Sequence, residues 1–82
     1  MYRIIWSKTA SAQLGKLGRT VAKTIDKKLE SIRETPFHFV KRLKGTPFHI
    51  LRVGKYRVIM QIENNTLVIF VIEVGHRKHI YK

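Results

Sequence analysis

The sequence contains no cysteine and few acidic residues. The absence of cysteine excludes disulfide bonds, zinc sites built on thiolates and a thiol nucleophile. Only five of the 82 residues are Asp or Glu, and they form no pair suited to acid–base catalysis. The histidines lack the carboxylate neighbours that a metal site needs. They are His38, His49, His76 and His79. We therefore predict no bound metal and no cofactor.

Long hydrophobic runs are also absent. Near the N-terminus only Ile4-Ile5-Trp6 is continuously apolar, which is too short for a signal sequence or a membrane span. We therefore expect a soluble, cytoplasmic protein that does not act at a membrane. Hydrophobic residues make up 44% of the chain, which is enough for one modest core. We expect a single domain over residues 1–82.

Negative charge is scarce relative to positive charge. Seventeen Lys and Arg against five Asp and Glu give a formal net charge of +12. Such an excess attracts polyanions, so nucleic acid and an acidic protein both fit as partners. A membrane surface fits less well, because no stretch combines a basic face with a long apolar one.

The N-terminal half is predicted to form a strand and two helices. The β-prone segment 2–6 precedes a helix that begins at Ser7 or Thr9 and ends before Gly18. A second helix begins near Thr20 and carries one apolar stripe. It is expected to end at Thr35-Pro36, because the residue before proline avoids helical backbone.

The C-terminal half is predicted to form three strands after a loop at 36–47. The strands are expected at 48–53, 56–63 and 66–74, joined by turns at Gly54-Lys55 and Asn64-Asn65. Gly75 begins a short basic tail. The order βααβββ indicates an α+β fold in which an αα-hairpin covers one face of a small, mainly antiparallel sheet. The last strand is apolar on both faces, so we place it inside the sheet, beside the first strand.

The Gly54-Lys55 turn brings two arginines together. With this turn, Arg52 lies opposite Arg57. Alternation directs both away from the helices, beside Ile50 and Ile59. Like charges directly opposite each other are destabilising, so the pair requires solvent or an anion between them. Two guanidinium forks above an aliphatic floor suit a phosphate. The competing interpretation is that both arginines simply solvate an exposed sheet face.

Other basic residues can extend this site from the loop and the tail. The candidates are Lys41, Arg42, Lys44, Arg77 and Lys78. Tyr81 is either a hydrophobic anchor for the tail or a phenol among cations that stacks or exchanges a proton. His76 is a possible acid–base helper. His49 falls on the helix-covered face and is expected to be structural.

The strings RLKG, LRVGKYRVIMQI and VIFVIEVGHRKHIY, taken with the βααβββ order, resemble the RelE family of toxins, in particular archaeal-type members. The resemblance covers essentially the whole chain. It implies an endoribonuclease that cuts mRNA codons in the ribosomal A site by metal-independent attack of the 2′-OH. It also implies that Arg52 and Arg57 stabilise the phosphate, that Arg77 orients it or protonates the leaving oxygen, and that Tyr81 stacks or exchanges a proton.

The resemblance has one departure. Some relatives carry a lysine two residues before Arg52, where this chain has Ile50. The general base is therefore open between Tyr81, Lys44 and His76. The family further implies an acidic antitoxin that binds the toxin in a hetero-oligomer.

Two other functions are compatible with the same sequence. The ParE-like branch shares this fold and inhibits DNA gyrase by binding. A non-catalytic module that binds RNA or the ribosome is the third interpretation. Phe70 is the only aromatic expected on the open sheet face, which disfavours a base-stacking platform.

Overall fold

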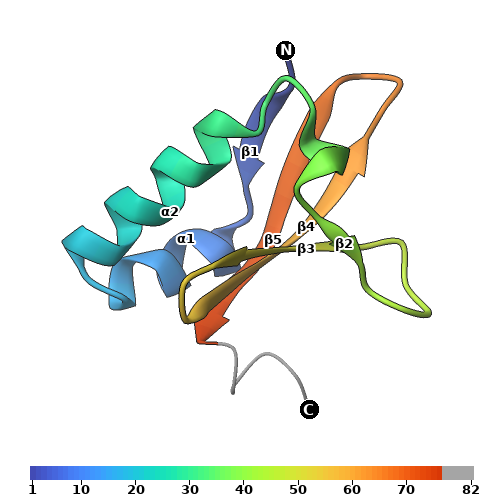
Figure 1. Cartoon of the computed structure of the whole chain (residues 1–82). Helices are drawn as coiled ribbons and strands as arrows, with labels where there is room; N and C mark the ends of the chain where they lie inside the picture. Colours follow the sequence, from blue (N-terminus) through green and yellow to red (C-terminus); the bar gives the residue numbers. More distant parts are fainter. Residues whose placement is uncertain (77–82) are drawn as a thin grey trace.

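The computed structural model describes residues 1–76, and Figure 1 shows their arrangement. The chain forms β1 (Arg3–Trp6), α1 (Lys8–Lys16), α2 (Arg19–Ser31), η1 (Pro36–His38), β2 (Lys41–Arg42), β3 (His49–Val53), β4 (Tyr56–Glu63) and β5 (Val68–His76). The strands form one sheet, and both long helices lie on the same side of it (Figure 1). The predicted α+β fold is confirmed.

The sheet has the strand order β1-β5-β4-β3-β2. Strand β5 pairs in parallel with β1 and antiparallel with β4, so it lies inside the sheet as predicted. The remaining pairs are antiparallel. The first and last of the described strands are therefore neighbours, and β3 lies between β4 and the edge strand β2.

The observed helix ends agree with the predicted ones, except at the end of α2. The Ser7 side chain caps α1 by accepting a hydrogen bond from the Ala10 N–H at 2.9 Å. Gly18 adopts φ 91°, which ends α1 and lets α2 begin at Arg19. However, α2 ends at Ser31 and not at Thr35, so the predicted end was wrong.

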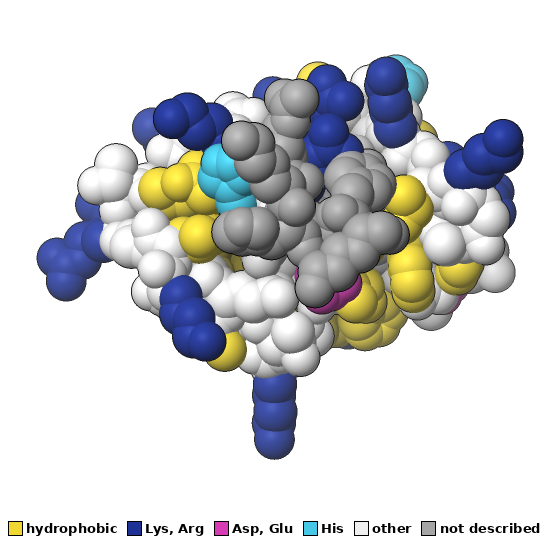
Figure 2. Space-filling model, turned by 90° about the horizontal axis from the view of Figure 1, so that it is seen from below, with side chains coloured by type: hydrophobic (Ala, Val, Ile, Leu, Met, Phe, Trp, Pro, Cys, Tyr) yellow, Lys and Arg dark blue, Asp and Glu magenta, His cyan; other side chains and the backbone are white. Residues whose placement is uncertain are grey.

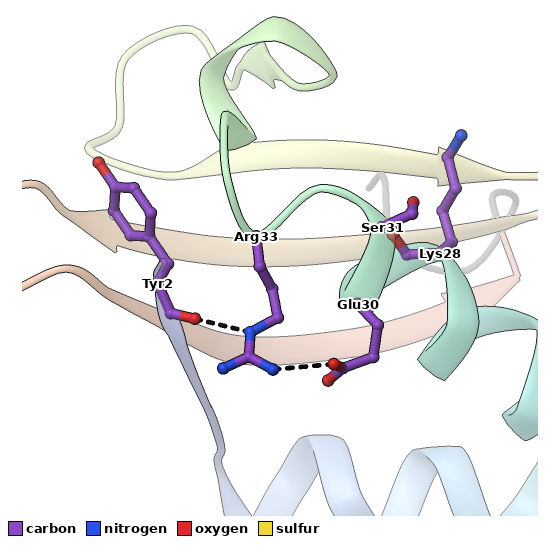
Figure 3. Close-up of polar contacts among 5 residues, drawn as sticks. All are labelled: Tyr2, Lys28, Glu30, Ser31 and Arg33. Carbon is purple, nitrogen blue, oxygen red and sulfur yellow. Dashed lines mark hydrogen bonds and ion pairs between the residues drawn. The ribbon is translucent and has the colours of Figure 1, made fainter.

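The early end of α2 follows from a connection to the first strand. Figure 3 shows the Arg33 guanidinium between two partners: Nε donates to the Tyr2 carbonyl at 2.7 Å, and Nη1 contacts Glu30 Oε1 at 2.8 Å. The Arg33 carbonyl also accepts from the Tyr2 N–H at 3.0 Å. These contacts bind the chain to β1 directly after the buried Ile32. The proline therefore acts later, as the first residue of η1.

The core lies between the helices and the covered face of the sheet. Ile25, Leu29 and Ile32 of the second helix and its end are fully buried. They pack with residues on the covered face of the sheet. These sheet residues are Leu51, Val53, Val58, Met60, Ile69, Val71 and Val74. Tyr56 and Ile62 pack against the same cluster.

A β-bulge in β5 interrupts the predicted alternation. Ile59 pairs with Glu73 and Met60 with Val71, so Ile72 has no paired residue on β4. Strict alternation would direct the Glu73 carboxylate into the core. The extra residue reverses the alternation, so that Glu73 is exposed and the next residue enters the core.

Ser7 and α1 satisfy the backbone at this bulge. The Ser7 hydroxyl donates to the Ile72 carbonyl at 2.9 Å, and Gln13 Oε1 accepts from the Val74 N–H at 2.7 Å. Because these two backbone groups have side-chain partners, the bulge leaves neither of them unpaired next to the core.

Three further details differ from the predicted elements. The turn before β5 spans residues 64–67, and Leu67, not an asparagine, takes the positive φ of 55°. Leu67 is accordingly exposed and not inward-facing. Strand β5 also continues to His76, past the expected start of the tail at Gly75. The short elements η1 and β2 lie in what was expected to be loop.

Candidate functional site

Arg52 and Arg57 face each other across the β3–β4 hairpin, in the predicted register. Gly54 adopts φ 59° in a two-residue turn, Val53 pairs with Tyr56, and Arg52 pairs with Arg57. Directly opposite residues have Cβ atoms about 5 Å apart. The sheet itself thus holds two permanent positive charges side by side on the face away from the helices.

The two arginines line a hollow of about 290 Å³ near the end of β2. The other lining residues come from α2, the segment after η1, β2 and β3. They are Lys28, Phe39, Lys41, Arg42, Ile50 and Leu51. Among residues 1–76, five of the eight that line the hollow are Lys or Arg, and none is Asp or Glu. Such a lining favours an anion.

The floor of the site is aliphatic. Ile50 and Ile59 on the open face are 6% and 5% exposed, and the Nε atom of Arg57 is itself withdrawn from solvent. Charge interactions strengthen where water is excluded. The predicted aliphatic floor beneath the arginines is therefore present. Glu73 shares this face, opposite Ile59, but does not line the hollow.

The basic residues of the preceding loop do not all reach the hollow. Lys41 and Arg42 line it. Lys41 lies directly opposite Ile50 in the β2–β3 pair. Arg42 is oriented by its Nε, which donates to the Thr46 carbonyl at 3.2 Å. Lys44 is exposed in the turn that follows and is not part of the lining.

His76 lies on the opposite face of the sheet from Arg57. It pairs with Tyr56, and the two rings meet edge to face at 5.8 Å. The residue opposite Arg57 on β5 is Gly75. The structure therefore does not bring the His76 ring beside the arginine pair.

His49 lies within the sheet, paired with Arg42 of β2 and Met60 of β4. Its ring meets Phe37 edge to face at 5.4 Å, and Arg42 lies opposite it on β2. Among residues 1–76 its buried Nδ1 has no hydrogen-bond partner. Burial, and to a lesser extent the charge of Arg42, lowers the pKa of His49 below its usual value of 6.5.

The remaining predicted site residues are Arg77, Lys78 and Tyr81, which lie outside the described residues, as does His79.

Within the described part of the chain, no three histidine or carboxylate side chains gather closely enough to hold a metal ion. No helix in residues 1–76 is long and apolar enough to cross a membrane. Lys and Arg side chains surround the face shown in Figure 2, with little acidic surface among them.

Two residues of the hollow were missed from the sequence. Phe39 comes from the segment between η1 and β2, and Lys28 comes from α2. The Lys28 ammonium lies over the Phe39 ring, 5.6 Å from its centroid. The hollow therefore includes an aromatic ring, which comes from outside the strands of the sheet. No short-range pattern marks either residue, because both reach the site through the tertiary fold.

Comparisons with known proteins give the family. A family model for the ParE toxin of the type II toxin–antitoxin system, parDE, matches residues 4–81. The mRNA interferase toxin RelE of Escherichia coli K12 is 35% identical over 80 residues, which cover 94% of this chain and 84% of that protein. The chain belongs to the RelE/ParE family of toxins.

Solved structures of RelE toxins have the same fold. In the intact E. coli RelBE toxin–antitoxin complex, a chain 32% identical to this one superimposes with a TM-score of 0.78, covering 93% of this chain and 96% of that one. In the archaeal RelE–RelB complex from Pyrococcus horikoshii OT3, the identity is 24% and the TM-score 0.79, with 95% and 97% covered. The archaeal likeness concerns the fold alone. The hollow thus lies on a RelE-type scaffold.

Proposed function

We propose that this chain is the toxin of a toxin–antitoxin module and inhibits translation by cutting mRNA codons in the ribosomal A site. The observation that carries the proposal is the hollow itself, where Arg52 and Arg57 meet three further cations and no carboxylate. Homology to the E. coli mRNA interferase supports the same activity. An anion site on a scaffold of this family suits a reaction at phosphorus.

The proposed reaction uses a nucleophile from the RNA. The 2′-OH loses its proton and attacks the adjacent phosphorus, and the bond from phosphorus to the 5′-oxygen breaks. The leaving oxygen takes up a proton, giving a 2′,3′-cyclic phosphate and a 5′-OH. Negative charge accumulates on the phosphoryl oxygens in the transition state, where Arg52 and Arg57 are placed to stabilise it.

Other groups complete the proposed site. Arg77 orients the phosphate or protonates the leaving oxygen, and Tyr81 stacks or exchanges a proton. Lys41 and Arg42 contact the RNA from the hollow, and Lys78 adds a further RNA contact. Lys44 and His76, also expected to bind RNA, lie outside the lining of the hollow and are left out of the proposed site. For the proton acceptor we propose Lys41 or Tyr81 in place of Lys44 and His76, because Lys41 lies opposite Ile50 and shares the hollow with both arginines.

The partners follow from the charge and from the relatives. A net charge of +12 suits an acidic antitoxin in a hetero-oligomer, as well as mRNA on the ribosome. The E. coli RelE chain is found in the RelBE toxin–antitoxin complex. We propose that residues 1–82 act as one domain, in the cytoplasm, where translating ribosomes are available.

The test is to map the 5′ ends of mRNA on arrested ribosomes after expression of the toxin. We expect new ends inside A-site codons. Arg57→Ala should lower the cleavage rate by about 10²- to 10³-fold, the usual effect of removing a transition-state donor. The control Arg19→Ala removes the same charge from α2, outside the hollow. Equal cleavage by both variants would contradict the assigned role.

Inhibition of DNA gyrase is the second candidate, favoured by the description of the matching family model as a ParE toxin. It predicts intact mRNA together with relaxed or broken DNA in arrested cells. A non-catalytic RNA- or ribosome-binding module would instead bind ribosomes and produce no new mRNA ends. The same experiment therefore separates all three functions.

A further inference from the structure

Phe39 exposes an aromatic ring to solvent beside the clustered cations of the hollow. The residue retains 48% of its surface, whereas its neighbour Val40 packs against the core. Phe39 instead lines the hollow, together with the arginine pair and Lys41. A half-exposed apolar ring beside clustered cations is complementary to a ligand that is both flat and anionic.

Lys28 orients the Phe39 ring. Its ammonium lies 5.6 Å from the ring centroid, within the range of a cation–π interaction. Figure 3 shows Lys28 and Glu30 leaving α2 in opposite directions, with Glu30 engaged by Arg33. The Lys28 charge is therefore directed toward the ring and the hollow, away from this carboxylate.

From these contacts we infer that Phe39 stacks on a nucleobase of the RNA whose phosphate lies on Arg52 and Arg57. The inference rests on the proposed function, because it takes RNA as the ligand. A nucleotide combines a flat base with a phosphate, and the hollow combines a ring with five cations. Stacking tolerates any base but is stronger for larger ring systems. The site accordingly prefers a purine at the stacked position.

Phe37 provides a matched control. It is also exposed, at 46%, and lies on η1, close to Phe39 in the chain. However, its ring contacts His49 edge to face, and it does not line the hollow. Replacing Phe37 removes an equally exposed ring from the same segment without changing the proposed base contact.

The experiment measures binding of the full chain to short single-stranded RNAs with a 2′-deoxy sugar at the cleavage site. One position carries a purine, a pyrimidine or an abasic sugar. Phe39→Leu should weaken binding of the purine RNA by about tenfold. It should not change the binding of RNA that carries an abasic sugar at the position of the stacked base. Phe39→Tyr should bind like the parent, and so should Phe37→Leu. Circular dichroism verifies that each variant is folded.

Two results would overturn the stacking role. One is that Phe39→Leu weakens the binding of base-containing and abasic RNA equally, whichever position is varied. The other is the same loss of affinity in Phe37→Leu as in Phe39→Leu. Failure of the proposed function looks different, since the parent protein would then leave ribosomal mRNA uncut whatever its binding to the oligonucleotides.

Discussion

The two faces of the sheet use neighbouring residues of the same strands for different purposes. On the covered face, Leu51, Val58 and Met60 are almost completely buried under the helices. On the open face, Arg52 and Arg57 stand above an aliphatic floor. One face therefore supplies the core, and the other carries the proposed phosphate site. Mutations at two consecutive positions of β3 should therefore differ, one lowering stability and the other lowering function.

The largest effect on stability is expected from Leu51→Ala. Leu51 is 1% exposed, so truncation should lower the free energy of unfolding by about 2–5 kcal/mol. Arg52→Ala, one residue away on the open face, should change it by less than about 0.5 kcal/mol. Urea unfolding of both variants measures the contrast. Similar losses would mean that the two faces do not divide these roles.

Lys41 and Lys44 test how far the open face extends into the loop. Only Lys41 lines the hollow. Lys41→Met should weaken binding of non-cleavable RNA by about tenfold, as expected for loss of a charged contact. Lys44→Met removes the same charge outside the lining and should cost less than about twofold. Equal effects would mean that both lysines only attract the polyanion through their charge and that Lys41 makes no specific contact.

His49 tests the covered face by its response to pH. Its lowered pKa means that the unfolded chain binds protons more readily than the folded one. The free energy of unfolding should therefore fall as the pH drops below 7 through the unfolded pKa, near 6.5. His49→Gln should show a shallower decrease in urea unfolding between about pH 7.5 and 5. An unchanged slope would contradict the assigned burial effect.

The sequence was sufficient for the fold where side-chain periodicity was strong. Alternation in the β3–β4 hairpin placed Arg52 opposite Arg57 because the two-residue turn left only one register. The apolar composition of the last strand placed it inside the sheet. These features depend on local spacing alone.

Features that depend on tertiary contacts were not visible in the sequence. The end of α2 is determined by the contacts of Arg33 with Tyr2. The bulge at Ile72 depends on Ser7 and Gln13, which are remote in the chain. Strand β2 has only two residues, too few for any periodicity.

The candidate site shows the same division. Lys41 and Arg42 were predicted because the loop is basic, but only the fold distinguishes them from Lys44. Phe39 and Lys28 were not predicted, since one lies in an irregular segment and the other on a charged helix surface. The position of Arg52 opposite Arg57 was predictable because it follows from the turn and from strand alternation alone.

The most direct test of the site is a double-mutant cycle on Arg52 and Arg57. Binding of a non-cleavable RNA is measured for the parent, Arg52→Ala, Arg57→Ala and the double variant, with Arg19→Ala paired to each as a control. If both guanidiniums hold one phosphate, the double variant should lose much less affinity than the two single losses combined. Pairs that include Arg19→Ala should give additive losses, because Arg19 lies outside the hollow. Losses that are equally additive for Arg52→Ala with Arg57→Ala would contradict a shared phosphate site.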